Sequence, residues 1–201
     1  MDSKGLSNYV VGEMLGQGNY GVVYSAKHIH TGQEVAIKFE TYGICPSLLK
    51  HEARVLLCLK GCTGIPKLIA YGVFGGIKYL IMEKMRHKVS PNELALFNKT
   101  LVNVRKELEM LLRTIHKKGF VHRDVKPDNI MLDFSGNVTL IDFGFATSYS
   151  SKQKKKSSKI VGTRSFLGPL GLAGYICPEV DNEGVEKSLE FYQSDLYEKL
   201  K

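Results

Sequence analysis

The chain has 201 residues, which is enough for one sizeable core or two small lobes, and its apolar content is that of an ordinary globular protein. It shows no membrane-length apolar run, signal peptide or myristoylation site, and its four cysteines lack paired metal-ligand spacing. We therefore expect an intracellular protein, cytoplasmic or nuclear, with buried free thiols and no membrane contact. The formal charge of +8 leaves three interpretations open: a nucleic-acid binder, a solvated basic loop, or a protein that acts on acidic or phosphorylated proteins.

The first predicted element is a strand over Tyr9–Leu15, followed by a glycine-rich turn. A G-x-G-x-x-G pattern alone could also be a dinucleotide fingerprint, but that loop opens a helix. Here Val22-Val23-Tyr24 is β-branched and aromatic, so the chain continues as a strand and the turn is a hairpin tip. Glycine N–H groups at such a tip can approach phosphates closely. The candidate nucleotide-binding residues are Leu15, Gly16, Gln17, Gly18, Asn19, Tyr20, Gly21, Val22 and Val23.

A lysine and a glutamate in the next two elements are predicted to form an ion pair. Glu34–Lys38 is a predicted strand that carries the V-A-I-K pattern and ends on Lys38. A helix is predicted over Pro46–Lys60, with Gly61 just past its end, and Glu52 lies on its apolar stripe. A lysine and a carboxylate that both face a core are costly unless they pair. A Lys38–Glu52 ion pair would account for both the lysine on an apolar strand and the glutamate on an apolar helix face.

Two further strands, Lys67–Val73 and Ile77–Met82, complete a predicted sheet of five strands. Ser90-Pro91-Asn92-Glu93 then resembles a capping box, and it predicts a long helix to Lys118 that is broken near Asn98.

The chemistry is concentrated in His122-Arg123-Asp124-Val125-Lys126-Pro127-Asp128-Asn129. A predicted β-hairpin follows this segment and ends at Asp142-Phe143-Gly144. Polar loops often simply face water, but eight residues in this order before Asp-Phe-Gly match a phosphoryl-transfer site. Asp124 is the candidate base for a substrate hydroxyl and Lys126 a positive charge near the transferred group. Asn129 and Asp142 supply the hard oxygen ligands that suit Mg²⁺.

These motifs resemble those of protein kinases, and residues 9–150 resemble the casein kinase 1 group in particular. The resemblance implies an α+β, bilobal kinase-like fold. A first lobe over residues 1–85 would hold a five-stranded antiparallel sheet with one helix, and a second lobe over residues 86–201 would be mainly helical and incomplete. Arg123 is then expected to pair with a charge in the activation segment.

The resemblance also implies the ligands. ATP and Mg²⁺ are the expected cofactors, and Lys126 favours serine or threonine acceptors in acidic or already phosphorylated protein substrates. Leu15 and Val23 are both expected above the adenine ring, with Met82 behind it and backbone groups of the Glu83–Met85 hinge at its edge. The implied site residues beyond the glycine loop are Ala36, Lys38, Glu52, Met82, Glu83, Met85, Asp124, Lys126, Asn129 and Asp142.

After residue 150 the resemblance is weak. The run Lys152–Lys159 holds five lysines and two serines, and it is expected to be a solvated loop rather than a phosphorylation site. The activation segment ends at Leu170 or, in the favoured alternative, at Glu179, with Thr163 lining the catalytic cleft. Tyr192–Tyr197 resembles the start of the helix at the hub of the second lobe, with Asp195 bonded to the catalytic loop.

The helices that normally follow are absent from the sequence, so we expect a partner protein over the exposed face, a local rearrangement or a fragment. An active Ser/Thr kinase is the first functional hypothesis, because every catalytic position is filled. A weak or inactive nucleotide-binding interaction module is the alternative. Nucleic-acid binding through Lys152–Lys159 is the third hypothesis and the least favoured, because no aromatic residues interleave the lysines.

Overall fold

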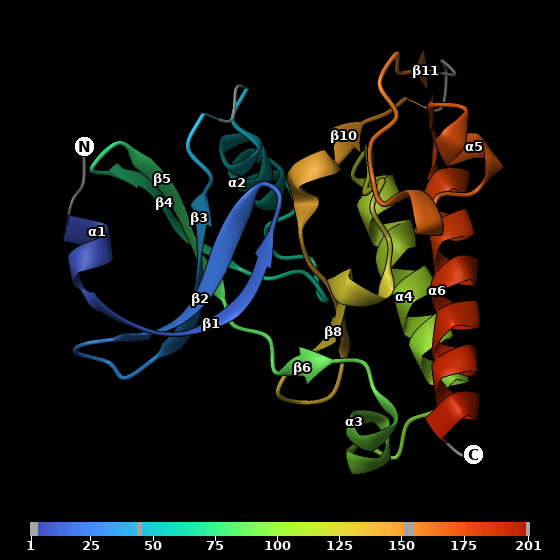
Figure 1. Ribbon diagram of the computed structural model, residues 1–201, viewed down its shortest axis with the longest axis horizontal. Helices are drawn as coiled ribbons and strands as arrows, with labels where there is room; N and C mark the ends of the chain where they lie inside the picture. Colours follow the sequence, from blue (N-terminus) through green and yellow to red (C-terminus); the bar gives the residue numbers. More distant parts are fainter. Residues whose placement is uncertain (1–3, 44–45, 151–154, 200–201) are drawn as a thin grey trace. The chain divides into compact units, whose positions relative to one another are not determined.

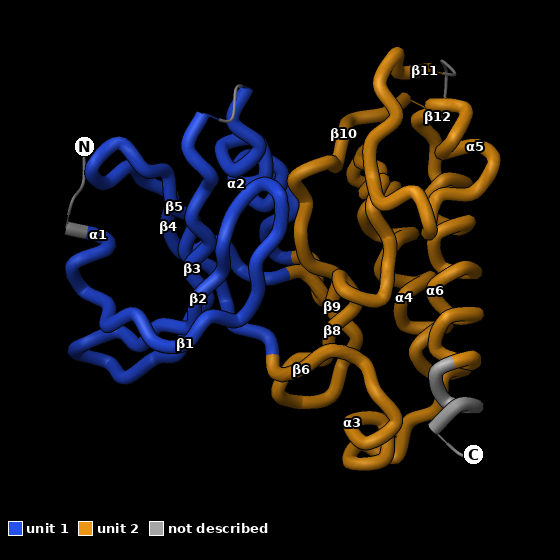
Figure 2. Tube along the Cα trace, in the orientation of Figure 1, with its two compact units in different colours: residues 1–61, 66–85 blue, residues 62–65, 86–201 orange. Residues whose placement is uncertain are grey.

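The computed structural model describes residues 4–43, 46–150 and 155–199. The chain divides into two compact units, which are coloured separately in Figure 2. The first comprises the residues up to Gly61 together with Pro66–Met85, and the second comprises Cys62–Ile65 and the residues from Arg86 onward. Cys62–Ile65 were predicted to belong to the first lobe. They group with the second unit because the Gly64 carbonyl accepts a hydrogen bond from Leu140 N at 3.0 Å.

The first unit is built on an antiparallel sheet with the strand order β1-β2-β3-β5-β4 (Figure 1). This confirms the predicted five-stranded antiparallel sheet, which the structure supplements with a one-turn helix, α1 (Lys4–Ser7). The strands are β1 (Tyr9–Gly18), β2 (Gly21–His28), β3 (Glu34–Glu40), β4 (Leu68–Phe74) and β5 (Ile77–Glu83).

One cluster of buried side chains from β2, β3 and β5 forms a core of this unit: Ala26, Val35, Ile37, Tyr79 and Ile81. Helix α2 (Leu48–Cys58) packs on β3, β4 and β5 through its own buried residues, which are Leu49, Glu52, Ala53, Val55 and Leu56. The helix begins two residues later than predicted, because the Ser47 side chain accepts a hydrogen bond from Lys50 N and so forms the N-cap.

The second unit combines helices with short strands. Its helices are α3 (Pro91–Leu96), α4 (Leu101–Lys117), α5 (Pro169–Leu172) and α6 (Pro178–Lys199). One small sheet has the order β6-β8-β9, and two pairs of strands join β10 to β7 and β11 to β12. The strands are β6 (His87–Lys88), β7 (Phe120–Val121), β8 (Ile130–Leu132), β9 (Val138–Leu140), β10 (Thr147–Ser148), β11 (Lys155–Lys156) and β12 (Tyr175–Ile176).

The predicted break near Asn98 separates α3 from α4. Asn98 has a φ of 51°, in the left-handed region that ends a helix readily. Thr100 then starts α4 with a capping box, in which Thr100 and Asn103 each accept a hydrogen bond from the other's backbone N–H. The buried face of α4 is Val104, Leu108, Leu111, Leu112 and Ile115.

Helices α4 and α6 lie side by side (Figure 1), and Arg105 on α4 binds Glu186 on α6 through two contacts of 2.5 Å. The hub helix was predicted to start at Tyr192, and this was wrong: α6 starts at Pro178. The side chain of Asp195 lies outside the described part of the chain. Among the described residues, no helix is both long enough and apolar enough to cross a membrane.

Candidate functional site

The glycine loop is the tip of the β1–β2 hairpin. Gly18 and Gly21 are cross-strand partners, so Asn19 and Tyr20 form the turn between them. A Cβ added at Gly16 or Gly18 would meet no atom within 4 Å, whereas one at Gly21 would run into the Phe39 carbonyl oxygen on β3. The first two glycines therefore leave the tip open, and Gly21 allows close strand packing. Gln17 and Val22 are also cross-strand partners in this hairpin.

Replacing Gly21 by alanine is expected to destabilise the first unit by about 2 kcal/mol, because the new methyl group overlaps a backbone atom that cannot move away cheaply. Gly18→Ala is the matched control, since its methyl group points into open space. Thermal denaturation followed by circular dichroism would measure both. Equal melting temperatures for the two variants would contradict the proposed packing role of Gly21.

The predicted lysine–glutamate pair is present in the first unit. Lys38 Nζ on β3 lies 2.8 Å from Glu52 Oε2 on α2, and the Glu52 side chain is only 2% exposed. A carboxylate this buried is tolerated because the ammonium group neutralises it. The ion pair thus holds the lysine in one position on β3, which continues two residues beyond the predicted end at Lys38.

The residues expected around an adenine ring are distributed over the same sheet. Ala36 and Met82 are buried cross-strand partners on β3 and β5, and Val23 pairs with Lys38. Leu15 is exposed on β1, and Met85 is buried at the end of the unit. In the expected hinge, the Glu83 N–H donates to the Lys67 carbonyl at 2.9 Å, so this amide already has a hydrogen-bond partner within the unit.

In the second unit, Asp124 is the centre of a polar network. The side chain is buried, and its Oδ1 accepts a hydrogen bond from Thr163 N at 2.7 Å. Its Oδ2 lies 3.0 Å from Lys126 Nζ and 3.1 Å from Asn129 Nδ2. Lys126 Nζ also donates to Thr163 Oγ1 at 2.8 Å. The predicted positive charge, Lys126, and the predicted metal ligand, Asn129, therefore both contact the carboxylate of the predicted base, Asp124.

Asp181, near the start of α6, holds the backbone of the catalytic loop at His122 and Arg123. Asp181 Oδ2 accepts from His122 N at 2.9 Å and Oδ1 accepts from Arg123 N at 2.8 Å. Its Oδ2 also lies 2.8 Å from His116 Nε2 on α4. Sequence reasoning assigned this task to Asp195 and missed Asp181. The usable signal was an acid in the first turn of the helix, directly after Val180, the first residue of the apolar stripe that continues with Val185, Leu189 and Tyr192.

Among the described residues, the charge that acts on Arg123 is Asp181 of α6, whereas a charge of the activation segment was expected. Burial lowers the pKa of the Arg123 guanidinium, and Asp181 opposes that shift. The residue has a φ of 70°, in the left-handed region. Two backbone amides fixed by Asp181 help to hold that conformation.

Asn129 and Asp142 are brought together by the backbone. Ile141 N, next to Asp142, donates to the Asn129 carbonyl at 2.9 Å. The Asn129 side-chain nitrogen is bound to Asp124, so its amide oxygen is the atom that fits a cation. The described residues contain no group of three or more histidine, cysteine or acidic side chains that could hold a metal ion by themselves. Two hard oxygen ligands suit Mg²⁺, which usually keeps waters and substrate phosphate oxygens as its other ligands.

A comparison with protein-family models matches residues 9–181 to the protein kinase domain. The chain belongs to the protein kinase family. The match includes the glycine loop, the Lys38–Glu52 pair, the catalytic loop and Asp181. Kinase domains generally use ATP and Mg²⁺ and act on protein substrates, so the family makes this chain a phosphotransferase by class.

The activation segment of this kinase is attached to α6. Glu183 accepts hydrogen bonds from Leu170 N at 3.1 Å and Gly171 N at 3.4 Å, at the start of α5. Of the two predicted ends of the segment, Leu170 lies inside α5 and Glu179 lies in the first turn of α6. The acid that binds this turn is Glu183, which sequence reasoning missed because its partners are backbone amides.

The basic run of the kinase is only partly described. Lys152 and Lys154 lie outside the described residues, whereas Lys155 and Lys156 form β11 and pair with β12. The Lys156 ammonium lies 5.1 Å from the centroid of the Tyr175 ring. This part of the run is therefore an ordered strand, and not the loop that was predicted.

Proposed function

We propose that this kinase transfers the γ-phosphate of ATP to serine or threonine hydroxyl groups of proteins, in the manner of the casein kinase 1 group. The observation that supports it best is the Asp124 network, because Lys126 and Thr163 both fix the carboxylate that would meet the acceptor. Phosphoryl transfer depends mainly on positioning and charge neutralisation, and this network provides both.

Each group has a defined task in the proposed reaction. Asp124 accepts the proton of the attacking hydroxyl, and the ammonium group of Lys126 stabilises negative charge on the transferred phosphoryl group. The carboxylate and amide oxygens of Asp142 and Asn129 would hold Mg²⁺, which neutralises phosphate charge when bound. In the first unit, Lys38 would bind ATP phosphate oxygens while Glu52 orients its side chain.

Basic residues of the chain support the proposed serine or threonine acceptor and the proposed acidic or phosphorylated protein substrates. Lys126, which the resemblance links to serine and threonine acceptors, is held in the catalytic loop by its hydrogen bond to Thr163 Oγ1. The net charge of +8 and the exposed Lys155 and Lys156 on β11 support acidic or phosphorylated protein substrates. The catalytic loop His122–Asn129 supports the casein kinase 1 type through its match to that group's sequence.

Transfer of labelled γ-phosphate from Mg·ATP to a set of peptides would test this function. The peptides carry one serine, threonine or tyrosine, each flanked either by aspartates or by alanines. We expect label on serine and threonine only, with a lower KM for the aspartate series, and a KM difference that shrinks as salt screens the charges. Label on tyrosine, or the same KM for both series, would contradict the acceptor or the substrate class respectively.

A further inference from the structure

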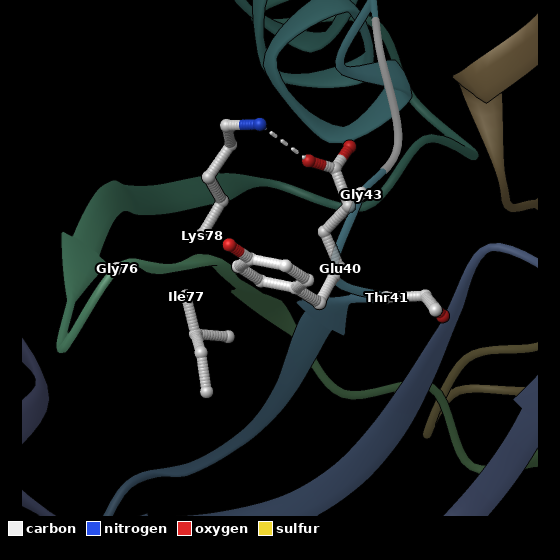
Figure 3. A pocket seen from close by; sticks show the side chains of 7 residues that line it. Glu40, Thr41, Gly43, Gly76, Ile77 and Lys78 are labelled. Atoms are coloured by element: carbon white, nitrogen blue, oxygen red, sulfur yellow. Dashed lines mark hydrogen bonds and ion pairs between the residues drawn. The ribbon is translucent and has the colours of Figure 1, made fainter.

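The side chain of Glu40 is a buried acid for which the proposed function has no task. Figure 3 shows it at the end of β3, directed toward Lys78 of β5, and its carboxylate lies 2.8 Å from the Lys78 ammonium. Ser47 Oγ donates to both carboxylate oxygens at 2.8 Å. Leu49 N, in the first turn of α2, donates to Oε1 at 2.9 Å. One buried carboxylate therefore joins β3, β5 and the N-terminus of α2.

Glu40 lies two residues after Lys38 on the same strand, so both side chains point to the same face, the one that carries α2. Glu52 in turn lies one helical turn after Leu49. Two polar contacts thus join the strand to the helix, and the donor lies on the strand in one of them and on the helix in the other. At one point Lys38 of the strand donates to Glu52 of the helix. At the other point the helix N-terminus donates to Glu40 of the strand.

We propose that Glu40 is a positioning residue, which sets the N-terminus of α2 on β3 and thereby holds Glu52 against Lys38. Its catalytic consequence rests on the proposed kinase function, but the geometric claim does not. Without the Glu40 contact, the first turn of α2 loses an acceptor for the Leu49 amide and the partner of its N-cap residue, Ser47.

The bond of Glu40 to the helix backbone is better shielded from water than its contact with Lys78. The Lys78 side chain is 33% exposed, and a pocket of about 350 Å³ lined in part by Thr41, Gly76 and Ile77 lies beside it (Figure 3). Water therefore screens the ion pair, whereas the bond to Leu49 N is buried. Burial alone would raise the pKa of Glu40, but Lys78, Leu49 N–H and Ser47 hold the pKa below its ordinary value. The acid is consequently an anion that can cap the helix.

The test is the reactivity of the Lys38 amine in the folded protein. Acetylation by dilute acetic anhydride, read by mass spectrometry, is compared with that of Lys84, which pairs with Glu34 at 2.8 Å. An ammonium group released from its carboxylate loses its proton more readily and reacts faster. In Glu40→Gln we expect Lys38 to react about fivefold faster, because a helix end that loses its cap loosens. The reactivity of Lys84 should not change.

Glu34→Gln is the matched control, since it removes a glutamate of the same strand, β3, that pairs with Lys84 and not with α2. It should leave the Lys38 rate unchanged. Ser47→Ala, which removes a smaller part of the attachment, replaces Glu40→Gln if circular dichroism shows that the latter is unfolded. An unchanged Lys38 rate in the folded variant would overturn the proposal.

Kinase turnover separates this inference from the proposed function. If wild type transfers phosphate, Glu40→Gln should raise the KM for ATP about fivefold with an unchanged KM for the peptide, the split expected when only the phosphate-binding lysine is displaced. If wild type transfers none, the proposed function fails, and the Lys38 acetylation rate still decides whether Glu40 positions α2.

Discussion

Replacing Asp124 by asparagine is expected to lower the rate of phosphate transfer about 100-fold to 10,000-fold, the range that general-base catalysis contributes. The substitution keeps the shape of the side chain and one oxygen, but it removes the basic carboxylate and the charge that faces Lys126 at 3.0 Å. ATP binding should persist, because Lys38, Glu52 and the glycine loop all belong to the first unit. Radiolabel transfer would measure the rate, and the ATP-dependent rise in melting temperature would measure binding.

The matched control for this experiment is Asp128→Asn, the same change in the same loop. Asp128 is 65% exposed and pairs with Lys88 at the surface, so its loss should change the transfer rate less than about twofold. Transfer by Asp124→Asn at the wild-type rate would contradict the assignment of the base. Loss of ATP-dependent stabilisation together with activity would mean instead that the substitution damages the fold.

Replacing Asp181 by asparagine is expected to destabilise the second unit by about 3 kcal/mol, because a buried charged acceptor of several hydrogen bonds is lost. The carboxylate is 1% exposed and serves the backbone N–H groups of His122 and Arg123 and the ring of His116. An asparagine amide would point a donor at one of these donors. The chain has no tryptophan, so urea unfolding would be followed by far-ultraviolet circular dichroism.

Asp133→Asn provides the comparison, since Asp133 also accepts two backbone N–H groups, from Ser135 and Asn137, but in a solvent-accessible turn. Asparagine supports such turns well, so the cost should stay under about 1 kcal/mol. The Asp181 variant should also lose phosphate transfer in conditions where it remains folded, because the Asp124 loop loses its support. Equal stability of the two variants would show that Asp181 is not the anchor of the loop.

The sequence alone was enough for the features that depend on neighbouring residues. A glycine tip followed by β-branched residues indicated the β1–β2 hairpin, and a helix break was predicted near Asn98, where the structure places a residue with a left-handed φ. The Lys38–Glu52 pair could be predicted because each residue was anomalous on its own apolar strand or stripe. For the hairpin and the ion pair, the spacing of apolar residues or the cost of burying an unpaired charge left one consistent arrangement.

The tertiary structure alone decided which acids hold the backbone in place. Asp181, Glu183 and Glu40 accept hydrogen bonds from backbone amides of distant segments, and a backbone amide leaves no trace in the sequence. The start of α6 was missed because it depends on packing against α4, which is also a long-range contact, and not on a pattern in the residues before Tyr192. The sequence determined which groups carry the chemistry, whereas long-range packing determined what holds them still.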